Sequence, residues 1–515
     1  MHEPGACSHP QLQPLTLKEL GANGATMNSP ANPTDGAVAD DQPLRGGVIS
    51  LPRLLLVLVP AMLLVPVAAD MVSLVLPRIA GQFAASTPQV AWVVTGFLLA
   101  CAIGIPIYGR MADQYSLRRL FTIALAVFAI GNLIGALAPG LLVLVAGRIV
   151  AGAGGAAIPV LAIVAATRLL PLGKAAIGVG FIGAAGGLGT ALGPAIGGGL
   201  GQALGWRALF WLLAAWAIIL IPVVHRIIAD TRPADTRRLD APGGILLGAA
   251  AGLLLFGITQ SEGAHGFAAS SSWGALLAGI VAAALFAWRT HAAADPFVPP
   301  SVFTHRGYLA AVTVIFLAMM VNLTTVVLVP ILLIDVNGLT PGQGALVMIP
   351  GGLALAVTAP LAGRLGAHRA NEGAVAFAGL GLIALAMLFL STFAAGATPA
   401  LAGLVVLALG AGFALVVTLA TSGVSRILPP EQVGAGVGIF QAAQFLGAGT
   451  GPVLFGVLLT VRQTSDTDPI NPLYTGHAPA YSDTFLGLTV VAVLAMIAAL
   501  RMRTMRAASP SSTTA

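Results

Sequence analysis

The sequence predicts an all-helical integral membrane protein, and three observations support this prediction. Of 515 residues, 57% are apolar and only 8% are charged, which the surface of a soluble protein of this size would not tolerate. Apolar runs of about 20 residues, the length of a membrane-spanning helix, follow one another from about Leu54 to Ala499. The runs are continuous and rich in Ala, Leu and Gly, whereas spanning strands would alternate.

Fourteen spans are expected, separated by short loops that contain Arg, Pro, Asp or Asn. They cover 54–76, 89–109, 119–138, 141–169, 174–201, 206–226, 242–261, 272–290, 308–334, 342–363, 373–393, 399–424, 432–460 and 484–501. Of the 24 Lys and Arg residues, three (Arg78, Arg207, Arg462) lie in odd-numbered loops and Arg148 lies within a span. The others lie in the two tails and the even-numbered loops, on the same side as the termini. Loops rich in Lys and Arg stay on the cytoplasmic side. Both termini are therefore predicted to be cytoplasmic, in a multi-pass protein of the cell membrane.

The loop between the sixth and seventh spans is the most polar stretch between the tails and marks a domain boundary. We expect two six-helix bundles joined by a linker with two extra spans. The predicted ranges are a disordered cytoplasmic tail at 1–52, bundles at 53–227 and 307–503, the linker at 228–306 and a second cytoplasmic tail at 504–515. "PIYGRMADQYSLRR" and "PLAGRLGAHRA" follow the second span of each bundle, which indicates internal duplication.

The composition also argues against several classes of protein. The net charge is +6, but the basic residues stand singly at helix ends, so no nucleic-acid partner is expected. Two cysteines far apart give neither a disulfide framework nor a metal site. Motifs for zinc proteases, phosphate-binding loops and nucleophile elbows are lacking. We expect no enzyme activity, no cofactor and no bound metal.

Asp70 lies in the first apolar run and is the strongest functional candidate. A carboxylate within a membrane is costly unless it is paired, hydrated or protonated, and burial favours proton uptake. Asp70 is therefore predicted to carry a proton in a transport cycle. The alternative is that the span begins earlier and that Asp70 lies near the outer surface.

Arg148 is the one basic residue within an apolar run away from either end. A guanidinium there needs partners. Asp70 is one candidate, and release of such a pair on protonation would switch the conformation. The alternative is a fixed donor to backbone carbonyls of a neighbouring helix.

The fifth span, "GFIGAAGGLGTALGPAIGGGLG", carries small residues at nearly every third or fourth position. One helix face is almost bare backbone, so other helices can approach closely. Pro194 is expected to bend the helix where the two bundles move. Packing alone would also explain the glycines.

The loop "GRMADQYSLRR" places Asp113 near Arg110, Arg118 and Arg119 at a cytoplasmic helix end. We expect these charges to form a conformational latch between the bundles. A solvated loop that only sets the membrane orientation is the alternative.

Weaker candidates lie in the second bundle. Asp335, at the end of the ninth span, is a candidate second titrating group, although an exposed helix-end carboxylate is equally consistent with the sequence. Asn322, Gln441 and Gln444 are candidates for lining a polar substrate cavity, with single interhelical hydrogen bonds as the alternative.

These motifs resemble the major facilitator superfamily, in particular its fourteen-helix drug:proton antiporters. The likeness extends from about residue 53 to 501. The matching positions are Gly109, Met111, Ala112, Asp113, Arg118 and Arg119 in the loop motif, Arg148 and Gly152 in the fourth span, and Gly189, Gly193, Pro194, Gly197 and Gly198 in the antiporter motif of the fifth. The resemblance implies the major facilitator fold, with two halves that alternate around a central site.

Within that group the chain is most similar to the tetracycline exporters of Gram-positive bacteria. By this resemblance, Asp70 and Asp335 stand at two acidic positions of the membrane region. Two other acidic positions are Thr190 and Ala448 here, and the usual glycine of the loop motif is Ser116. These departures leave drug:proton antiport as the expectation and leave the substrate open.

The predicted function is proton-coupled efflux of drugs or antibiotics by alternating access. The expected partners are a small hydrophobic substrate, neutral or cationic, together with protons and the lipid bilayer, and we expect a monomer. Two other functions fit the sequence: an exporter of an endogenous metabolite with the same mechanism, and a non-transporting receptor on the same fold.

Overall fold

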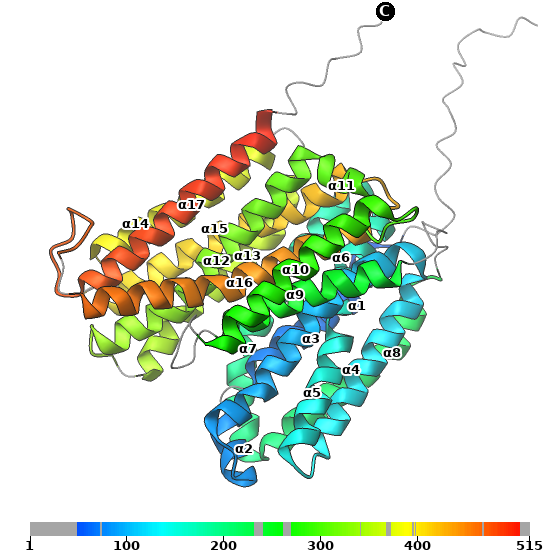
Figure 1. Ribbon diagram of the computed structural model, residues 1–515, viewed down its shortest axis with the longest axis horizontal. Coiled ribbons are helices and arrows are strands. Elements are labelled where there is room, and N and C mark those ends of the chain that lie inside the picture. Colours follow the sequence, from blue (N-terminus) through cyan, green and yellow to red (C-terminus); the bar gives the residue numbers. More distant parts are fainter. Residues whose placement is uncertain are drawn as a thin grey trace, which may run out of the picture. The chain divides into compact units, whose positions relative to one another are not determined.

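The computed structural model describes residues 49–72, 75–230, 240–260, 269–339, 341–366, 372–393, 396, 398–465 and 468–504 (Figure 1). These residues form helices and no strand. Thirteen helical segments are long and apolar enough to cross a membrane. The remaining predicted span coincides with α7, a helix of 32 residues whose membrane crossing stays a prediction. The predicted all-helical, multi-pass membrane fold is confirmed.

The first group of helices, called here the N-terminal helices, corresponds to the first six predicted spans. It comprises α1 (Leu51–Asp70), α2 (Leu76–Phe83), α3 (Thr87–Gln114), α4 (Leu117–Ala136), α5 (Leu141–Gly155), α6 (Ala157–Leu169), α7 (Leu172–Ala203) and α8 (Trp206–Ile227). The predicted span 141–169 is divided between α5 and α6, which meet at Ala156 after a run of glycines.

The second group, called here the C-terminal helices, comprises α12 (Arg306–Asp335), α13 (Pro341–Gly366), α14 (Glu372–Phe393), α15 (Pro399–Ile427), α16 (Val433–Thr464) and α17 (Pro479–Thr504). Between the groups lie α9 (Ala241–Gln260), α10 (Ser270–Ala292) and the short α11 (Pro300–Thr304). The pair α9 and α10 matches the two extra spans. The exact domain ranges stay predictions, and most of the two predicted tails lies outside the described residues.

Two pairs of helices join the groups through glycines. At Gly109 of α3 a Cβ atom would lie 2.5 Å from the carbonyl oxygen of Gly434 in α16. At Gly180 of α7 it would lie 2.4 Å from the carbonyl oxygen of Ala359 in α13. Backbones this close are typical of membrane helices that pack through small residues.

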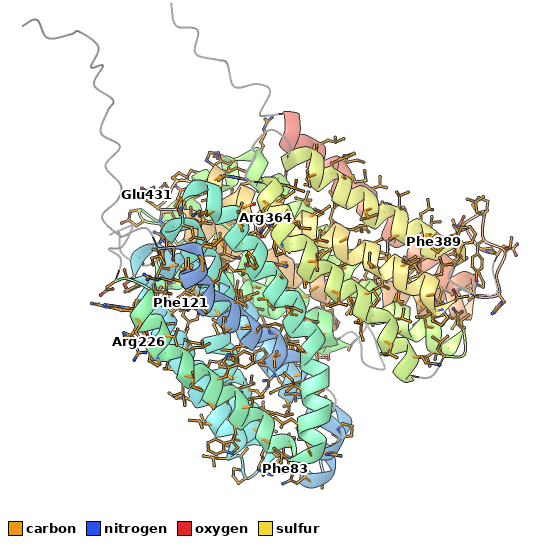
Figure 2. The ribbon with its side chains drawn as sticks, turned by 180° about the vertical axis from the view of Figure 1, so that it is seen from behind. Phe83, Phe121, Arg226, Arg364, Phe389 and Glu431 are labelled. Atoms are coloured by element: carbon orange, nitrogen blue, oxygen red, sulfur yellow. The ribbon has the colours of Figure 1, made fainter. Side chains whose placement is uncertain are left out.

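Two ends of the helices are distinguished below. The Asp113 end contains the last turns of α3 and α6 and the first turns of α4, α7 and α16, and the Asp70 end is opposite. Figure 2 shows Phe121 and Arg226 at the Asp113 end of the N-terminal helices and Phe83 at the Asp70 end.

The first span differs from its prediction. Helix α1 begins at Leu51 and ends at Asp70, whereas the predicted span ran from 54 to 76. Asp70 is therefore the last helical residue and not an interior one. The apolar residues that follow belong partly to α2, a short amphipathic helix that begins at Leu76 and has Pro77 in its first turn, where the missing amide donor of proline costs no helical hydrogen bond.

Candidate functional site

The Asp70 end of α1 lies against a row of glycines on α7. At Gly189 a Cβ atom would lie 2.4 Å from Cγ of Pro66, and at Gly197 it would lie 2.1 Å from the carbonyl oxygen of Met71. The glycines recur every fourth residue, which places them on one helix face. Any side chain on this face would separate α1 from α7, so these glycines of the predicted antiporter motif form a joint with α1.

Asp70 is part of this joint. At Gly193 a Cβ atom would lie 2.8 Å from Cβ of Asp70, and the Thr190 hydroxyl, which donates to the carbonyl oxygen of Gly186 at 3.4 Å, also interacts with the Asp70 carboxyl group. Asp70 is half-buried, and no basic side chain pairs with it among the described residues. Pro194 and Gly198 also lie in α7, but the side chain of Pro194 is outside the description.

Arg148 is held elsewhere. Its Nε donates a hydrogen bond of 2.8 Å to the carbonyl oxygen of Val93, and its guanidinium carbon lies 4.1 Å from the centroid of the Phe97 ring. The side chain is 1% exposed, and its Nη1 and Nη2 have no hydrogen-bond partner in the described part of the chain. The suggested pair of Arg148 with Asp70 is not formed in this structure. Arg148 is instead a donor to a backbone carbonyl, which was the alternative interpretation.

Asp113 joins the two groups of helices. Its carboxylate accepts hydrogen bonds from the amides of Gly434 (2.8 Å) and Ala435 (2.9 Å), in the first turn of α16. The first amides of a helix lack partners within the helix and carry a partial positive charge, so a carboxylate is a favourable cap. Asp113 thus caps a helix of the opposite group and is fully buried.

Arg168, at the end of α6, completes this cluster. It forms an ion pair with Asp113 and donates to the carbonyl oxygens of Ala112 (2.7 Å) and Pro430 (2.9 Å). We call Asp113, Arg168 and the α16 amides the cross-bundle cluster. Sequence reasoning missed Arg168, because a basic residue at a helix end was counted only as an orientation signal. Arg110, which was predicted there, is buried beside the cluster and acts on Asp113 electrostatically.

Arg118 and Arg119 contact a different carboxylate. Both pair with Asp230, at 3.1 and 3.9 Å, and the Ser116 hydroxyl donates to the same group. The Ser116 hydrogen bond and the two arginines hold the pKa of Asp230 below its usual value. The grouping of these arginines with Asp113 was therefore wrong in geometry: they tie the segment after α8 to the start of α4.

Comparisons with known proteins identify the family. The model of the Major Facilitator Superfamily matches residues 58–452. The chain belongs to this superfamily. Multidrug resistance protein Stp of Mycobacterium tuberculosis is 28% identical over 403 residues, which cover 78% of this chain and 74% of that protein. The tetracenomycin C resistance and export protein of Streptomyces glaucescens is 27% identical over 412 residues, covering 80% and 76% respectively.

A solved structure agrees with the fold. The human organic anion transporter MFSD10 (TETRAN) superimposes with a TM-score of 0.62 at 16% identity, covering 87% of this chain and 99% of that chain. At this identity the likeness concerns the fold alone. Membership of the Major Facilitator Superfamily makes this chain a membrane transporter and not an enzyme.

The remaining residues that were predicted to belong to the functional site lie apart from the Asp70 joint. Asp335 is the last residue of α12 and is exposed. Asn322 in α12 and Gln444 in α16 are half-buried, whereas Gln441 is 5% exposed, and the two helices pack along each other. None of these contacts tests a cavity role, which stays a prediction.

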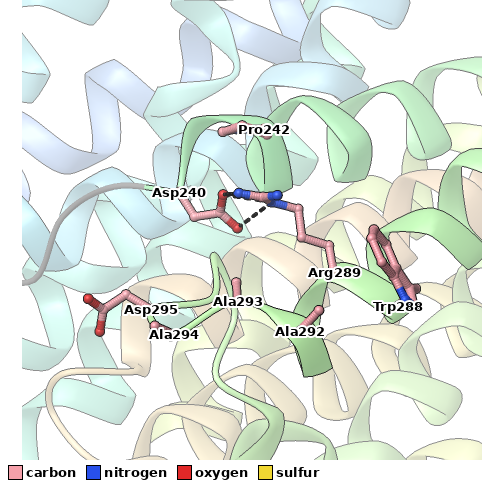
Figure 3. Close-up of a pocket in the computed structure, with 8 residues that line it drawn as sticks. All are labelled: Asp240, Pro242, Trp288, Arg289, Ala292, Ala293, Ala294 and Asp295. Atoms are coloured by element: carbon pink, nitrogen blue, oxygen red, sulfur yellow. Dashed lines mark hydrogen bonds and ion pairs between the residues drawn. The ribbon is translucent and has the colours of Figure 1, made fainter.

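Two cavities in the protein lie away from all these residues. One, of about 360 Å³, lies where α9 begins and α10 ends, around the ion pair of Asp240 and Arg289 (Figure 3). The other, of about 410 Å³, is an apolar groove between the first three turns of α13 and of α15. No group of three potential metal-ligating side chains occurs in the described ranges.

Proposed function

We propose that this transporter is a proton-coupled efflux antiporter for small hydrophobic compounds, neutral or cationic, and that Asp70 carries the proton. One observation supports this most strongly: Asp70 is a half-buried carboxyl group with a hydroxyl partner, Thr190, and no cationic partner in the described residues. A carboxylate without a cation can be neutralised by a proton or by a cationic substrate. Each ligand would then weaken the binding of the other, which is the coupling that antiport requires.

The cross-bundle cluster gives this proposal a second conformational element. Asp113 and Arg168 hold α16 against α3 and α6 in the present state. Alternating access would require these contacts to break and re-form, so the Asp113 end is proposed to be the cytoplasmic gate, with both termini in the cytoplasm. The names of the two bacterial relatives, which assign multidrug resistance and tetracenomycin C export to those proteins, favour outward transport.

The test is efflux measured in everted membrane vesicles, where transport away from the cytoplasmic face appears as uptake of ethidium into the lumen driven by a pH gradient. Asp70→Asn is expected to reduce gradient-driven efflux to the background of vesicles without the protein, while the amount of protein in the membrane stays unchanged. Asp335→Asn is the matched comparison, because Asp335 is also the last residue of a helix. Full efflux by Asp70→Asn would refute the assignment of the proton carrier, and loss in both variants would indicate two titrating groups.

A second candidate is export of one specific metabolite by the same mechanism. The relative that is named for a single compound, tetracenomycin C, favours it. Comparison of the culture media of the parent strain and a deletion strain tests it: disappearance of one compound from the medium is expected for a dedicated exporter, whereas a multidrug exporter changes susceptibility to several unrelated drugs.

A further inference from the structure

Helix α9 packs closely along α3. At Gly252 of α9 a Cβ atom would lie 2.6 Å from Cγ1 of Ile103, and at Gly248 it would lie 3.0 Å from Cγ2 of the same residue. Nearer the Asp70 end, the rings of Phe256 and Trp92 lie 5.7 Å apart. The contact therefore extends over most of α9.

The same helix also packs against α16, but less extensively than against α3. Leu255 of α9 is 9% exposed, and a Cβ atom at Gly449 would lie 2.4 Å from its Cδ1. Direct contact of α3 with α16 occurs about 16 Å closer to the Asp113 end, at Gly109 and Gly438. In Figure 1, α9 runs beside α3, and α10 packs against α9. Helix α9 thus contacts both helices of this junction.

The other junction of the two groups has different surroundings. Helix α7 meets Leu355 of α13 at Gly187, where a Cβ atom would lie 2.2 Å from the leucine side chain. Beyond that contact, toward the Asp70 end, Leu192 of α7 and Ile349 and Leu353 of α13 are 44%, 48% and 56% exposed. Apolar side chains are thus uncovered at this junction, whereas Leu255 of α9 is almost fully covered.

We propose that α9 is a lateral seal that moves together with α3 and closes the α3–α16 side of the molecule to the bilayer. A lipophilic substrate that passes between the bilayer and the space between the two groups of helices then uses the α7–α13 side. The asymmetry of the contacts supports this: α9 packs on α3 through closely approaching glycines and an aromatic pair, and packs less extensively on α16, around Leu255 and Gly449. The route for substrate rests on the proposed efflux function, whereas the seal does not.

Two cysteine pairs test the seal in a background without the chain's two cysteines. The pair Leu255→Cys with Gly449→Cys links α9 to α16, and the control pair Gly252→Cys with Ile103→Cys links α9 to α3. After oxidation in everted vesicles, the first link is expected to lower Hoechst 33342 efflux at least tenfold and to be reversed by a reductant. The control link is expected to leave more than half of the efflux. Equal effects of the two links would overturn the proposal.

A cross-linking measurement separates failure of the seal from failure of the efflux function. Asp113→Asn removes an ion pair and weakens a helix cap of the cross-bundle cluster, and it should populate other arrangements of the two groups. In that variant the α9–α16 link is expected to form several-fold more slowly, while the rate of the α9–α3 link stays unchanged. If the α9–α3 link slows as well, α9 does not move with α3, whether or not the parent protein exports any dye.

Bulky substitutions test the route. Leu192→Trp is expected to raise the KM for Hoechst 33342 at least threefold, because it narrows the α7–α13 side. Leu285→Trp is the control, since Leu285 lies on the outer face of α10 and is similarly exposed (46%). An unchanged KM for Leu192→Trp would refute the route while the cross-linking rates still decide the seal.

Discussion

Arg148 and Arg207 share two kinds of contact in different surroundings, and Arg207 also donates a hydrogen bond of 3.3 Å to Oε1 of Gln82. Each donates to one backbone carbonyl, and each guanidinium stacks on an aromatic ring, at 4.1 Å on Phe97 and 4.3 Å on Trp206. Arg148 is buried and Arg207 is half-buried. A lysine cannot reproduce the planar stack, and a ring contact with a cation is worth about 2 kcal/mol when desolvated but about 0.5–1 kcal/mol at the surface.

We therefore predict that Arg148→Lys lowers the thermal unfolding temperature of the purified protein in detergent substantially more than Arg207→Lys. Equal shifts would show that burial of Arg148 does not strengthen its ring contact. Under the proposed function, Arg148→Lys also impairs efflux.

Asp113 and Asp230 provide a second matched pair. Both carboxylates pair with arginines at the Asp113 end, but Asp113 is fully buried and Asp230 is exposed. Removal of one partner from a fully buried ion pair costs about 3–5 kcal/mol, which is an upper bound here because Arg168 is 20% exposed and keeps its two carbonyl acceptors, whereas exposed pairs contribute little. Asp113→Asn is predicted to be strongly destabilising in thermal unfolding and Asp230→Asn to be nearly neutral. A double variant with Arg168→Gln should lose less than the sum of the two single losses.

At the scale of residues, the sequence predicted which side chains are unusual better than it predicted their partners. Asp70 and Arg148 were identified because charges in apolar runs are costly, and Asp113 was identified in a charged loop motif at a helix end. Their partners are Thr190, Arg168 and the Val93 carbonyl, and none of these was assigned. Partners on other helices depend on how the helices rotate about their axes, and a single sequence does not give that rotation.

At the scale of elements, the two faces of α7 make different contacts. Gly197 faces α1, where a Cβ atom would lie 2.1 Å from the carbonyl oxygen of Met71, whereas Gly199 has nothing within 4 Å. Alanine is favoured over glycine in a helix by about 1 kcal/mol where there is space. Gly197→Ala is predicted to destabilise the protein and Gly199→Ala to be neutral or slightly stabilising in thermal unfolding. Similar behaviour of both would show that α1 shifts freely along α7.

The α9–α10 pair is clamped at its Asp113 end by Asp240. Its carboxylate accepts from Arg289 Nη2 at 2.7 Å and from the amides of Gly243 and Phe297, both at 3.2 Å. Burial opposes ionisation of Asp240, but these hydrogen bonds more than offset it and hold its pKa below the usual value. A carboxyl group whose pKa is lowered by folding stabilises the protein above its unfolded pKa, and this stabilisation is lost as the pH falls through the folded pKa.

Asp240→Asn is therefore predicted to lower the unfolding temperature at pH 7, with a smaller difference from the wild-type protein near pH 3. Asp295→Asn is the control, because Asp295 lines the same cavity, is exposed and points away from the ion pair (Figure 3). A difference for Asp240→Asn that is constant with pH would show that the carboxylate charge does not matter.

Long apolar runs predicted the positions of the spanning helices within a few residues, because few other structures satisfy their backbone groups in lipid. Shorter elements were missed. Helices α2 and α11 have eight and five residues, too few for a periodic apolar pattern. The end of α1 at Asp70 was also missed, because the residues after Asp70 stay apolar and hydropathy does not show where helical hydrogen bonds stop.

At the scale of the whole molecule, the two groups of helices touch through glycines of α7. These glycines differ in how closely atoms of the other group approach them. At Gly180 a Cβ atom would lie 2.4 Å from the carbonyl oxygen of Ala359, whereas at Gly183, one turn further, the nearest atoms are at 3.7 and 3.8 Å, an ordinary contact. Alanine at 180 must push α13 away from α7. Alanine at 183 fits.

We therefore predict that Gly180→Ala shifts the protein away from the present state and Gly183→Ala does not. The reporter is Thr418→Cys in a background without the native cysteines, since Thr418 is 1% exposed and its side chain lies beside Gly183, between α15 and α7. In everted vesicles, labelling of this cysteine by a membrane-impermeant maleimide is expected to accelerate at least fivefold with Gly180→Ala and to stay at the parent rate with Gly183→Ala. Unchanged labelling in both would mean that α7 and α13 adjust locally, and that this junction does not set the arrangement of the two groups.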